Sequence, residues 1–263
     1  MERLSGGLIN DIQADSGCVI KAYNGDSLIS TPFEQRIRRE RWALNRFGGS
    51  IAPALYETTS QSIRMERIDG QPVNDILKTG ERDIPHTLFL AGEKLKEIHQ
   101  PIWGSIEDHQ KRFIRKAEKY FVKSIPVWSA AGIDPENVME YIHENTKPEK
   151  IQDFGVTAVH RDYWLNNTLY QNGTLKSVID WELSGIGSPY EDFAIVDLWI
   201  TRIHGHKESF WNGYGKEPRQ ESVNAFLLAK MSDFLSTTTP EALEDHDEAW
   251  FYWDTIRVAK EIL

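Results

Sequence analysis

The sequence has a single cysteine, Cys18, among its 263 residues. An internal disulfide is therefore excluded, which argues against a small disulfide-stabilised secreted protein. Long hydrophobic runs are also missing, and no apolar stretch approaches the roughly 20 residues that a membrane-spanning helix needs. The N-terminal residues lack the apolar core of a secretory signal peptide. We therefore expect a cytoplasmic protein without a membrane partner.

Positive charge is scarce, because the sequence has 30 Lys and Arg against 40 Asp and Glu, which gives a formal net charge of −10. Proteins that bind nucleic acid usually carry a basic patch that neutralises phosphates. The most basic stretch, residues 111–123, places apolar residues at helical spacing and indicates an amphipathic helix with a solvated basic face. We expect no nucleic-acid partner, and the acidic balance favours a cationic or amine-bearing ligand instead.

Strand patterns dominate the first 65 residues. Residues 17–23 are β-rich, Phe33 to Phe47 has the apolar spacing of a helix that stops at Gly48-Gly49, and residues 63–68 form a second strand closed by Asp69-Gly70. The length allows one large domain or two lobes. We expect a small β-rich N-terminal lobe over residues 1–68.

The remainder, residues 69–263, is expected to form a larger and mainly helical C-terminal lobe, which makes the fold class α+β. Pro85 opens a helix with Leu88, Ala91, Leu95 and Ile98 on one face. Further helices are expected over 107–123, 135–145, 190–203, 205–214, 219–235 and 240–262. The exception is residues 156–180, where Asn172-Gly173 between two strand patterns is a strong hairpin signal.

The stretch that carries chemistry includes Asp162, Asn167 and Asp180. Phosphoryl transfer to a hydroxyl needs a carboxylate that orients the hydroxyl and accepts its proton, and oxygen ligands that hold Mg²⁺ on the phosphates. The hairpin returns the chain so that Asp180 ends its second strand beside the loop with the other two residues. Oxygen ligands without cysteine or paired histidine indicate magnesium rather than zinc.

These residues also carry a resemblance. The spacing His160-x-Asp162-x-x-x-x-Asn167, followed by a hairpin and Ile179-Asp180-Trp181-Glu182, resembles the aminoglycoside phosphotransferase and choline kinase family, a branch of the protein-kinase-like fold. It implies a two-lobed small-molecule kinase that uses ATP and Mg²⁺, with GTP as an open alternative to ATP. Asp162 would be the catalytic base, and Asn167 and Asp180 the metal ligands. For His160 we prefer a structural role, in which it hydrogen-bonds the backbone and shapes the loop.

The same resemblance implies a nucleotide site in the small lobe. Strand alternation places Lys21 on the face towards the cleft, where it would contact the phosphates, and Glu40 would be its ion-pair partner. The alternative for Glu40 is a surface helix position among arginines. The segment 4–10 would be the nucleotide loop, although its glycines also fit a simple hairpin turn. The remaining nucleotide-binding candidates are Ser5, Gly6, Gly7, Asn10, Glu66 and Ile68, the last two through their backbone.

Two other classes compete with a small-molecule kinase. Arg161 gives His-Arg-Asp, as in protein Ser/Thr kinases, where the resembling family often has glycine. However, Asp180 is followed by Trp-Glu rather than Phe-Gly, no Ala-Pro-Glu segment follows, and the distance to Asp192 is short for an activation loop. A non-catalytic kinase-like binding module is disfavoured because Lys21, Asp162, Asn167 and Asp180 are all present.

The acceptor is expected to be a small cationic molecule, such as an aminoglycoside, another antibiotic or a choline-like metabolite. An antibiotic acceptor would give the protein a role in antibiotic resistance. Asp197 falls on an apolar helix face, and a buried carboxylate needs a partner, which is either the acceptor or an internal Arg or Trp. Trp164 and Trp199 would add an aromatic wall, with core packing as the alternative for each. The sequence leaves the acceptor's identity and the choice between monomer and homodimer open.

Overall fold

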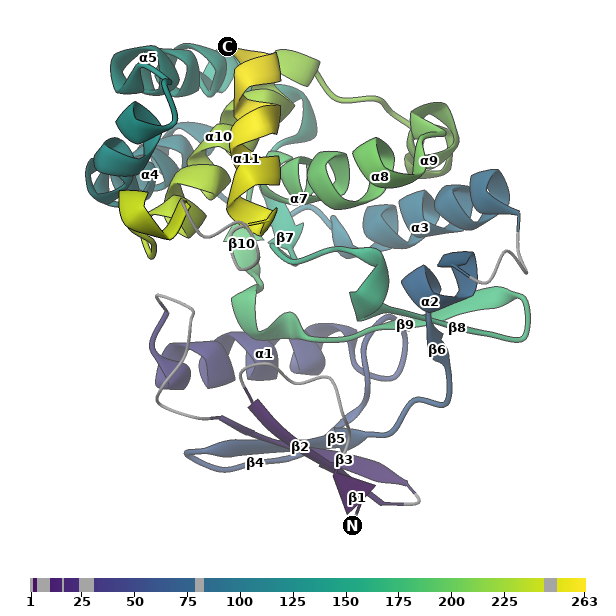
Figure 1. The fold of residues 1–263 in the computed structure, drawn as a ribbon. Coiled ribbons are helices and arrows are strands. Elements are labelled where there is room, and N and C mark those ends of the chain that lie inside the picture. The colour runs from purple at the N-terminus through teal and green to yellow at the C-terminus, as the bar shows by residue number, and fades with distance from the viewer. Residues whose placement is uncertain (1, 4–9, 16, 24–30, 79–82, 244–249) are drawn as a thin grey trace. The chain divides into compact units, whose positions relative to one another are not determined.

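The computed structural model describes residues 2–3, 10–15, 17–23, 31–78, 83–243 and 250–263. Its N-terminal part is an antiparallel sheet of five strands in the order β1-β2-β3-β5-β4 (Figure 1). The strands are β1 (Glu2–Arg3), β2 (Asn10–Ala14), β3 (Cys18–Tyr23), β4 (Leu55–Thr58) and β5 (Ser62–Glu66). The sheet confirms the strands expected near residues 17–23 and 63–68, and it adds β1, β2 and β4, for which we had no specific expectation.

Helix α1 (Phe33–Phe47) packs on this sheet and has the bounds expected from the sequence. Its buried side includes Ile37, Leu44 and Phe47. The helix ends at Gly48, whose backbone N–H donates to the Leu44 carbonyl at 2.9 Å. A Cβ at Gly48 would lie 2.4 Å from that carbonyl oxygen, so only glycine fits this close turn.

A second sheet joins β6 (Gln71–Pro72), β8 (Thr168–Gln171) and β9 (Thr174–Val178). The predicted hairpin connects β8 to β9, and Asn172 and Gly173 both have positive φ, 52° and 88°. Two central residues with positive φ give a type I′ turn, whose twist matches that of the strands. The turn fixes the register that delivers Asp180 two residues after β9.

The helices largely match the sequence expectations. They are α2 (Val73–Lys78), α3 (Ile84–Ile98), α4 (Ile106–Ala130), α5 (Pro135–Asn145), α6 (Pro148–Ile151), α7 (Tyr190–Val196), α8 (Arg202–His204), α9 (Lys207–Tyr214), α10 (Gln220–Leu235) and α11 (Trp250–Ile262). Helix α4 is longer than expected because Val127 and Trp128 continue its buried face beyond Pro126, which costs one backbone hydrogen bond. Short strands β7 (Thr157–Val159) and β10 (Gly185–Gly187) pair with each other. A π-helical turn, Asp197–Thr201, links α7 to α8.

Contacts divide the chain into two compact units. The first comprises residues 1–100, 158–186 and 195–217, and it holds both larger sheets with α1, α3 and α9. The second comprises residues 101–157, 187–194 and 218–263, and in it α10 packs against α4, α5 and α11. The predicted lobe boundary at residue 68 stays a prediction.

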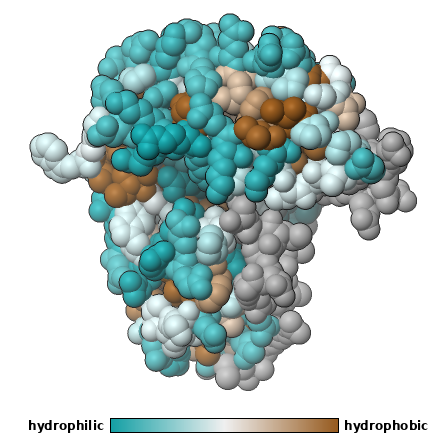
Figure 2. Space-filling model, turned by 90° about the vertical axis from the view of Figure 1, so that its left-hand side faces the viewer, coloured by the Kyte–Doolittle hydropathy of each residue, from teal (hydrophilic) through white to brown (hydrophobic). Residues whose placement is uncertain are grey.

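The surface agrees with a composition rich in charged residues. On the face drawn in Figure 2, hydrophilic residues predominate and hydrophobic residues form separate patches. None of the helices in the described part of the chain combines the length and the hydrophobicity needed to cross a bilayer.

Two glycines allow α3 and α9 to approach closely within the first unit. A Cβ at Gly213 would lie 1.9 Å from the Phe89 carbonyl oxygen, and a Cβ at Gly92 would lie 2.1 Å from the Phe210 carbonyl oxygen. Since both obstacles are backbone atoms, a side chain at either position must push the helices apart.

We therefore predict that Gly213→Ala lowers the free energy of unfolding by about 1–3 kcal/mol, net of the gain in helix propensity. Urea denaturation measures this. Gly17→Ala is the control, because nothing lies within 4 Å of a Cβ there. Equal stabilities of the two variants would contradict this packing.

Candidate active site

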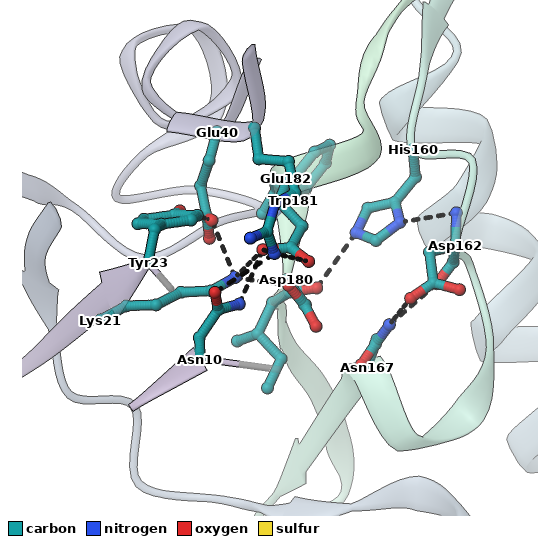
Figure 3. A network of polar contacts seen from close by, with 12 residues as sticks. Asn10, Lys21, Tyr23, Glu40, His160, Asp162, Asn167, Asp180, Trp181 and Glu182 are labelled. Atoms are coloured by element: carbon teal, nitrogen blue, oxygen red, sulfur yellow. Dashed lines mark hydrogen bonds and ion pairs between the residues drawn. The ribbon is translucent and has the colours of Figure 1, made fainter. Parts of the chain in front are cut away.

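Lys21 on β3 is surrounded by three carboxylates (Figure 3). Its Nζ lies 2.9 Å from Glu40 Oε2, 2.5 Å from Asp180 Oδ1 and 3.1 Å from Glu182 Oε2. The lysine side chain is only 5% exposed. Burial lowers the pKa of Lys21, but Asp180 and Glu40 outweigh burial and raise this pKa well above its usual value. The side chain is therefore a fixed, buried cation.

Glu40 on α1 is the expected ion-pair partner of Lys21, and its side chain is 1% exposed, which excludes the surface alternative. The Tyr23 hydroxyl donates a hydrogen bond to the same carboxylate oxygen. Burial raises the pKa of Glu40 above its usual value, although the Lys21 ammonium acts in the opposite direction. Burial also raises the pKa of Tyr23, so its phenol stays protonated and remains a donor.

Glu182 is a member of this cluster that the sequence analysis missed. It lies in the 3₁₀ turn Trp181–Leu183 and is 4% exposed. Asn10 donates its amide N–H to Glu182 Oε2 at 2.8 Å, and the fully buried Arg36 donates to Glu182 Oε1 at 3.3 Å. The nucleotide-binding role expected for Asn10 stays a prediction, and the structure shows its side chain bonded within this network.

Asp162 and Asn167 are joined directly. The Asn167 amide nitrogen donates to Asp162 Oδ2 at 2.8 Å and to the Asp162 carbonyl at 2.9 Å. The Ile179 N–H donates to the Asn167 carbonyl at 2.9 Å, which places the residue before Asp180 against the end of this loop. The structure therefore brings together the three residues that the sequence singled out for chemistry.

His160 holds the same two segments from the other side. Its Nε2 donates to the Ile179 carbonyl at 3.1 Å, and its Nδ1 accepts the Asp162 N–H at 3.3 Å. This pattern requires a neutral ring protonated at Nε2. The ring is fully buried. His160 thus has the backbone-binding, loop-shaping role that we preferred from the sequence.

The backbone is left-handed at two of these positions. Asp180 has φ 65° and ψ 58°, and Arg161 has φ 67°. Glycine adopts this region without steric cost, which accounts physically for a glycine at the position of Arg161 in the resembling family. Arg161 donates to the carbonyls of Leu183 at 3.3 Å and Ile186 at 3.0 Å. The guanidinium fits because Gly185 has no side chain. A Cβ at Gly185 would lie only 2.6 Å from Arg161 Nη1.

The side-chain oxygens of Asp180 and Asn167 are of the kind that a hard divalent cation binds. The Asp180 side chain is 40% exposed, and burial alone would raise its pKa, but Lys21 lowers this pKa below its usual value and keeps the carboxylate ionised. Because the Asn167 amide nitrogen donates to Asp162, its oxygen is the atom suited to a metal. A carboxylate and an amide oxygen are ligands that Mg²⁺ accepts. Glu40, Asp180 and Glu182 also cluster within 4.8 Å of one another, around the Lys21 ammonium.

The three acceptor candidates differ in their surroundings. Asp197 is 5% exposed, and its Oδ2 accepts from Arg202 Nε at 2.8 Å. This internal arginine is the partner that a structural Asp197 requires, so the pairing removes the support for Asp197 as an acceptor ligand. Trp164 and Trp199 are half-buried, and their rings lie 6.0 Å apart at an angle of 50°. Trp164 follows Asp162 by two positions.

The other nucleotide candidates are only partly described. Ser5, Gly6 and Gly7 lie outside the described residues. The Glu66 N–H donates to the Ala54 carbonyl at 2.8 Å, so an adenine contact by Glu66 would have to use its carbonyl. Ile68 follows β5 in an extended segment and is half-buried. The roles of these residues remain predictions.

Comparisons with known proteins agree with this geometry. The model of the phosphotransferase enzyme family matches residues 53–220, well over half of the chain. The chain therefore belongs to this family, which confirms the resemblance noted from the sequence and the class of small-molecule kinase. No curated protein matches the sequence significantly.

Solved structures of similar fold include antibiotic and metabolite kinases. A thermostable mutant of the aminoglycoside phosphotransferase APH(4)-Ia with AMP-PNP and hygromycin B is 16% identical with a TM-score of 0.70, covering 98% of this chain and 92% of that chain. Ethanolamine kinase from Plasmodium vivax is 15% identical with a TM-score of 0.64, covering 98% and 80%. The gentamicin complex of APH(2″)-IIa is 18% identical with a TM-score of 0.61, covering 99% and 89%. These similarities confirm the α+β kinase-like fold.

We predict that His160→Ala lowers the free energy of unfolding by about 1–3 kcal/mol, because it leaves the buried Ile179 carbonyl and Asp162 N–H without their partner. Urea denaturation measures the loss. His160→Gln, whose amide can donate and accept, should recover part of it. If His160→Ala were as stable as the wild type, the histidine would not hold these segments together.

Proposed function

We propose that the protein is an ATP- and Mg²⁺-dependent O-phosphotransferase that phosphorylates a hydroxyl group of a small molecule. The observation that carries this proposal is one continuous set of contacts. Asn167 binds Asp162 through its side chain and Ile179 through its backbone, and Asp180, the next residue, reaches the buried Lys21–Glu40 pair. The residues proposed as base, metal ligands and phosphate-binding lysine thus form one connected set of contacts, which supports the proposal. The AMP-PNP bound to APH(4)-Ia supports the choice of an adenine nucleotide.

In the proposed reaction, the acceptor hydroxyl attacks the γ-phosphorus while the bond to the β–γ bridging oxygen breaks and ADP leaves. Asp162 accepts the hydroxyl proton, and the Asn167 amide at 2.8 Å fixes the orientation of its carboxylate. Lys21 binds phosphate oxygens. Asn167 and Asp180 would hold Mg²⁺, which neutralises charge on the transferring phosphate.

The acceptor is proposed to lie against Trp164 and Trp199, since Trp164 is two residues from the proposed base and both side chains are half-buried. An aromatic face suits a cationic amine as well as a flat apolar group. Aminoglycosides, peptide antibiotics, choline, ethanolamine and thiamine are therefore the acceptors to test first, with ATP and Mg²⁺ and release of ADP as the measurement.

Asp162→Ala should lower kcat roughly 10²–10⁴-fold, the usual contribution of a positioned general base. A loss near the lower limit is expected if proton removal comes late in a dissociative transition state. Asp162→Asn is the matched variant, because it keeps the size of the side chain but removes the base. AMP-PNP affinity should change little in either variant. Turnover close to wild type would remove Asp162 from this role.

Trp199→Ala should raise the KM of the acceptor roughly 2- to 30-fold, as expected from the loss of a cation–π contact, and leave the KM of ATP unchanged. Trp199→Phe keeps an aromatic face and should recover much of the affinity. Steady-state kinetics with each substrate varied in turn measure both constants. An unchanged acceptor KM in Trp199→Ala would assign this ring to packing alone.

A further inference from the structure

The Lys21 ammonium has three N–H donors, and three carboxylates surround it. If Lys21 binds a nucleotide phosphate, as the proposed function requires, the phosphate oxygen must take the place of one carboxylate. Which carboxylate leaves depends on how firmly the protein holds each of them. Their surroundings differ sharply.

Glu40 is held on both sides. It comes from α1, its side chain is 1% exposed, and it accepts hydrogen bonds from both Lys21 and the Tyr23 hydroxyl. Moving it away from Lys21 would leave a buried carboxylate without its cation, which is strongly destabilising. Glu40 is therefore a fixed partner of Lys21.

Glu182 is held even more extensively. Besides Lys21 at 3.1 Å, it binds Asn10 from β2 at 2.8 Å and Arg36 from α1 at 3.3 Å. Arg36 also donates to the Asn10 side-chain oxygen at 3.3 Å, and its guanidinium lies 5.6 Å from the centre of the Tyr23 ring. Glu182 is thus tied to two strands and a helix of the first unit, and all of its partners are buried.

Asp180 differs from the other two carboxylates. Its side chain is 40% exposed, against 1% for Glu40 and 5% for Glu182. It can turn towards solvent or a ligand without leaving a carboxylate buried and unpaired. It is also the carboxylate that the proposed function assigns to the metal. Release from Lys21 would make Asp180 available for that purpose.

We propose that Glu182 is a positioning residue that, together with Glu40, holds Lys21 in place while Lys21 exchanges Asp180 for a phosphate oxygen. Arg36 and Asn10 keep the Glu182 carboxylate in position for this task. The assignment rests on the proposed function, because it concerns how the lysine reaches the nucleotide.

The competing interpretation makes Glu182 a metal ligand, since its carboxylate lies within 4.8 Å of those of Glu40 and Asp180. The charges favour the positioning role. Glu182 is already bound by one ammonium and one guanidinium, both buried. A divalent ion at Glu182 would have to displace one of these cations, and a buried cation without its partner is costly.

The test is a double-mutant cycle on AMP-PNP affinity, measured by calorimetry in the presence of a chelator and again with Mg²⁺. We expect Glu182→Gln to weaken metal-free binding about 10-fold, because Glu40 alone then holds the lysine charge. In a Lys21→Met background the same change should have less than about a 2-fold effect, because Glu182 acts through the lysine. The Mg²⁺ concentration that gives half-maximal enhancement of binding should not change.

Asn10→Ala provides a second variant if Glu182→Gln does not fold. It removes the 2.8 Å bond to Glu182 but no charge, so it should weaken binding about 3-fold, again only when Lys21 is present. An effect that persists without Lys21 would mean that Asn10 contacts the nucleotide itself, and would overturn its part in the proposal.

The outcomes separate this proposal from the proposed function. Failure of the wild type to bind AMP-PNP under any condition would remove the nucleotide site altogether. Nucleotide binding by the wild type, with unchanged or tighter metal-free binding in Glu182→Gln, would overturn only the positioning role. Additive effects of the two changes on AMP-PNP affinity would also overturn it. A loss of affinity in Glu182→Gln that appears only with Mg²⁺ would overturn it too, because that is the pattern of a metal ligand.

Discussion

Burial of the Lys21 ammonium is the constraint on which the first unit depends. Removing such a charge from water costs several kcal/mol, and only closely placed, hydrogen-bonded carboxylates offset that cost. The carboxylates come from distant segments, because Glu40 lies on α1 while Asp180 is 159 residues from Lys21 along the chain. The sheet, the helix and the segment after the hairpin therefore meet at this lysine.

Backbone contacts fix the position of Asp180 as much as side-chain contacts do. The type I′ turn sets the register of β8 and β9, and Asn167 and His160 then bind the N–H and the carbonyl of Ile179. Asp180 follows Ile179 directly. Its own backbone is left-handed, and this conformation turns its side chain towards Lys21. Arg161 adds a further tie to the following segment, which offsets its unfavourable φ of 67°.

The sequence was sufficient where a feature is local. The bounds of α1, the hairpin and the spacing of Asp162 and Asn167 follow from patterns a few residues long. Glu182 and Arg36 were missed because their partners come from other elements, although Arg36 and Glu40 stand among the apolar positions of α1, where charges need buried partners. For Asp197 the helical period correctly indicated a buried carboxylate. Of the two kinds of partner left open, the structure shows an internal arginine, because the π-helical turn brings Arg202, five residues on, to this carboxylate.

That pairing changes how acceptor selection is understood. Net acidity of −10 had favoured a cationic acceptor held by a buried carboxylate, but net charge describes long-range attraction and specifies no contact. With Asp197 paired to Arg202, the proposed acceptor contacts that remain are the indole rings of Trp164 and Trp199. Such rings bind a cation through its charge and a flat apolar group through stacking. An acceptor therefore needs no more than one positive charge to bind them. If the acceptor binds these rings as proposed, acceptors with a single amine or a planar ring would suit the site at least as well as a polycationic aminoglycoside.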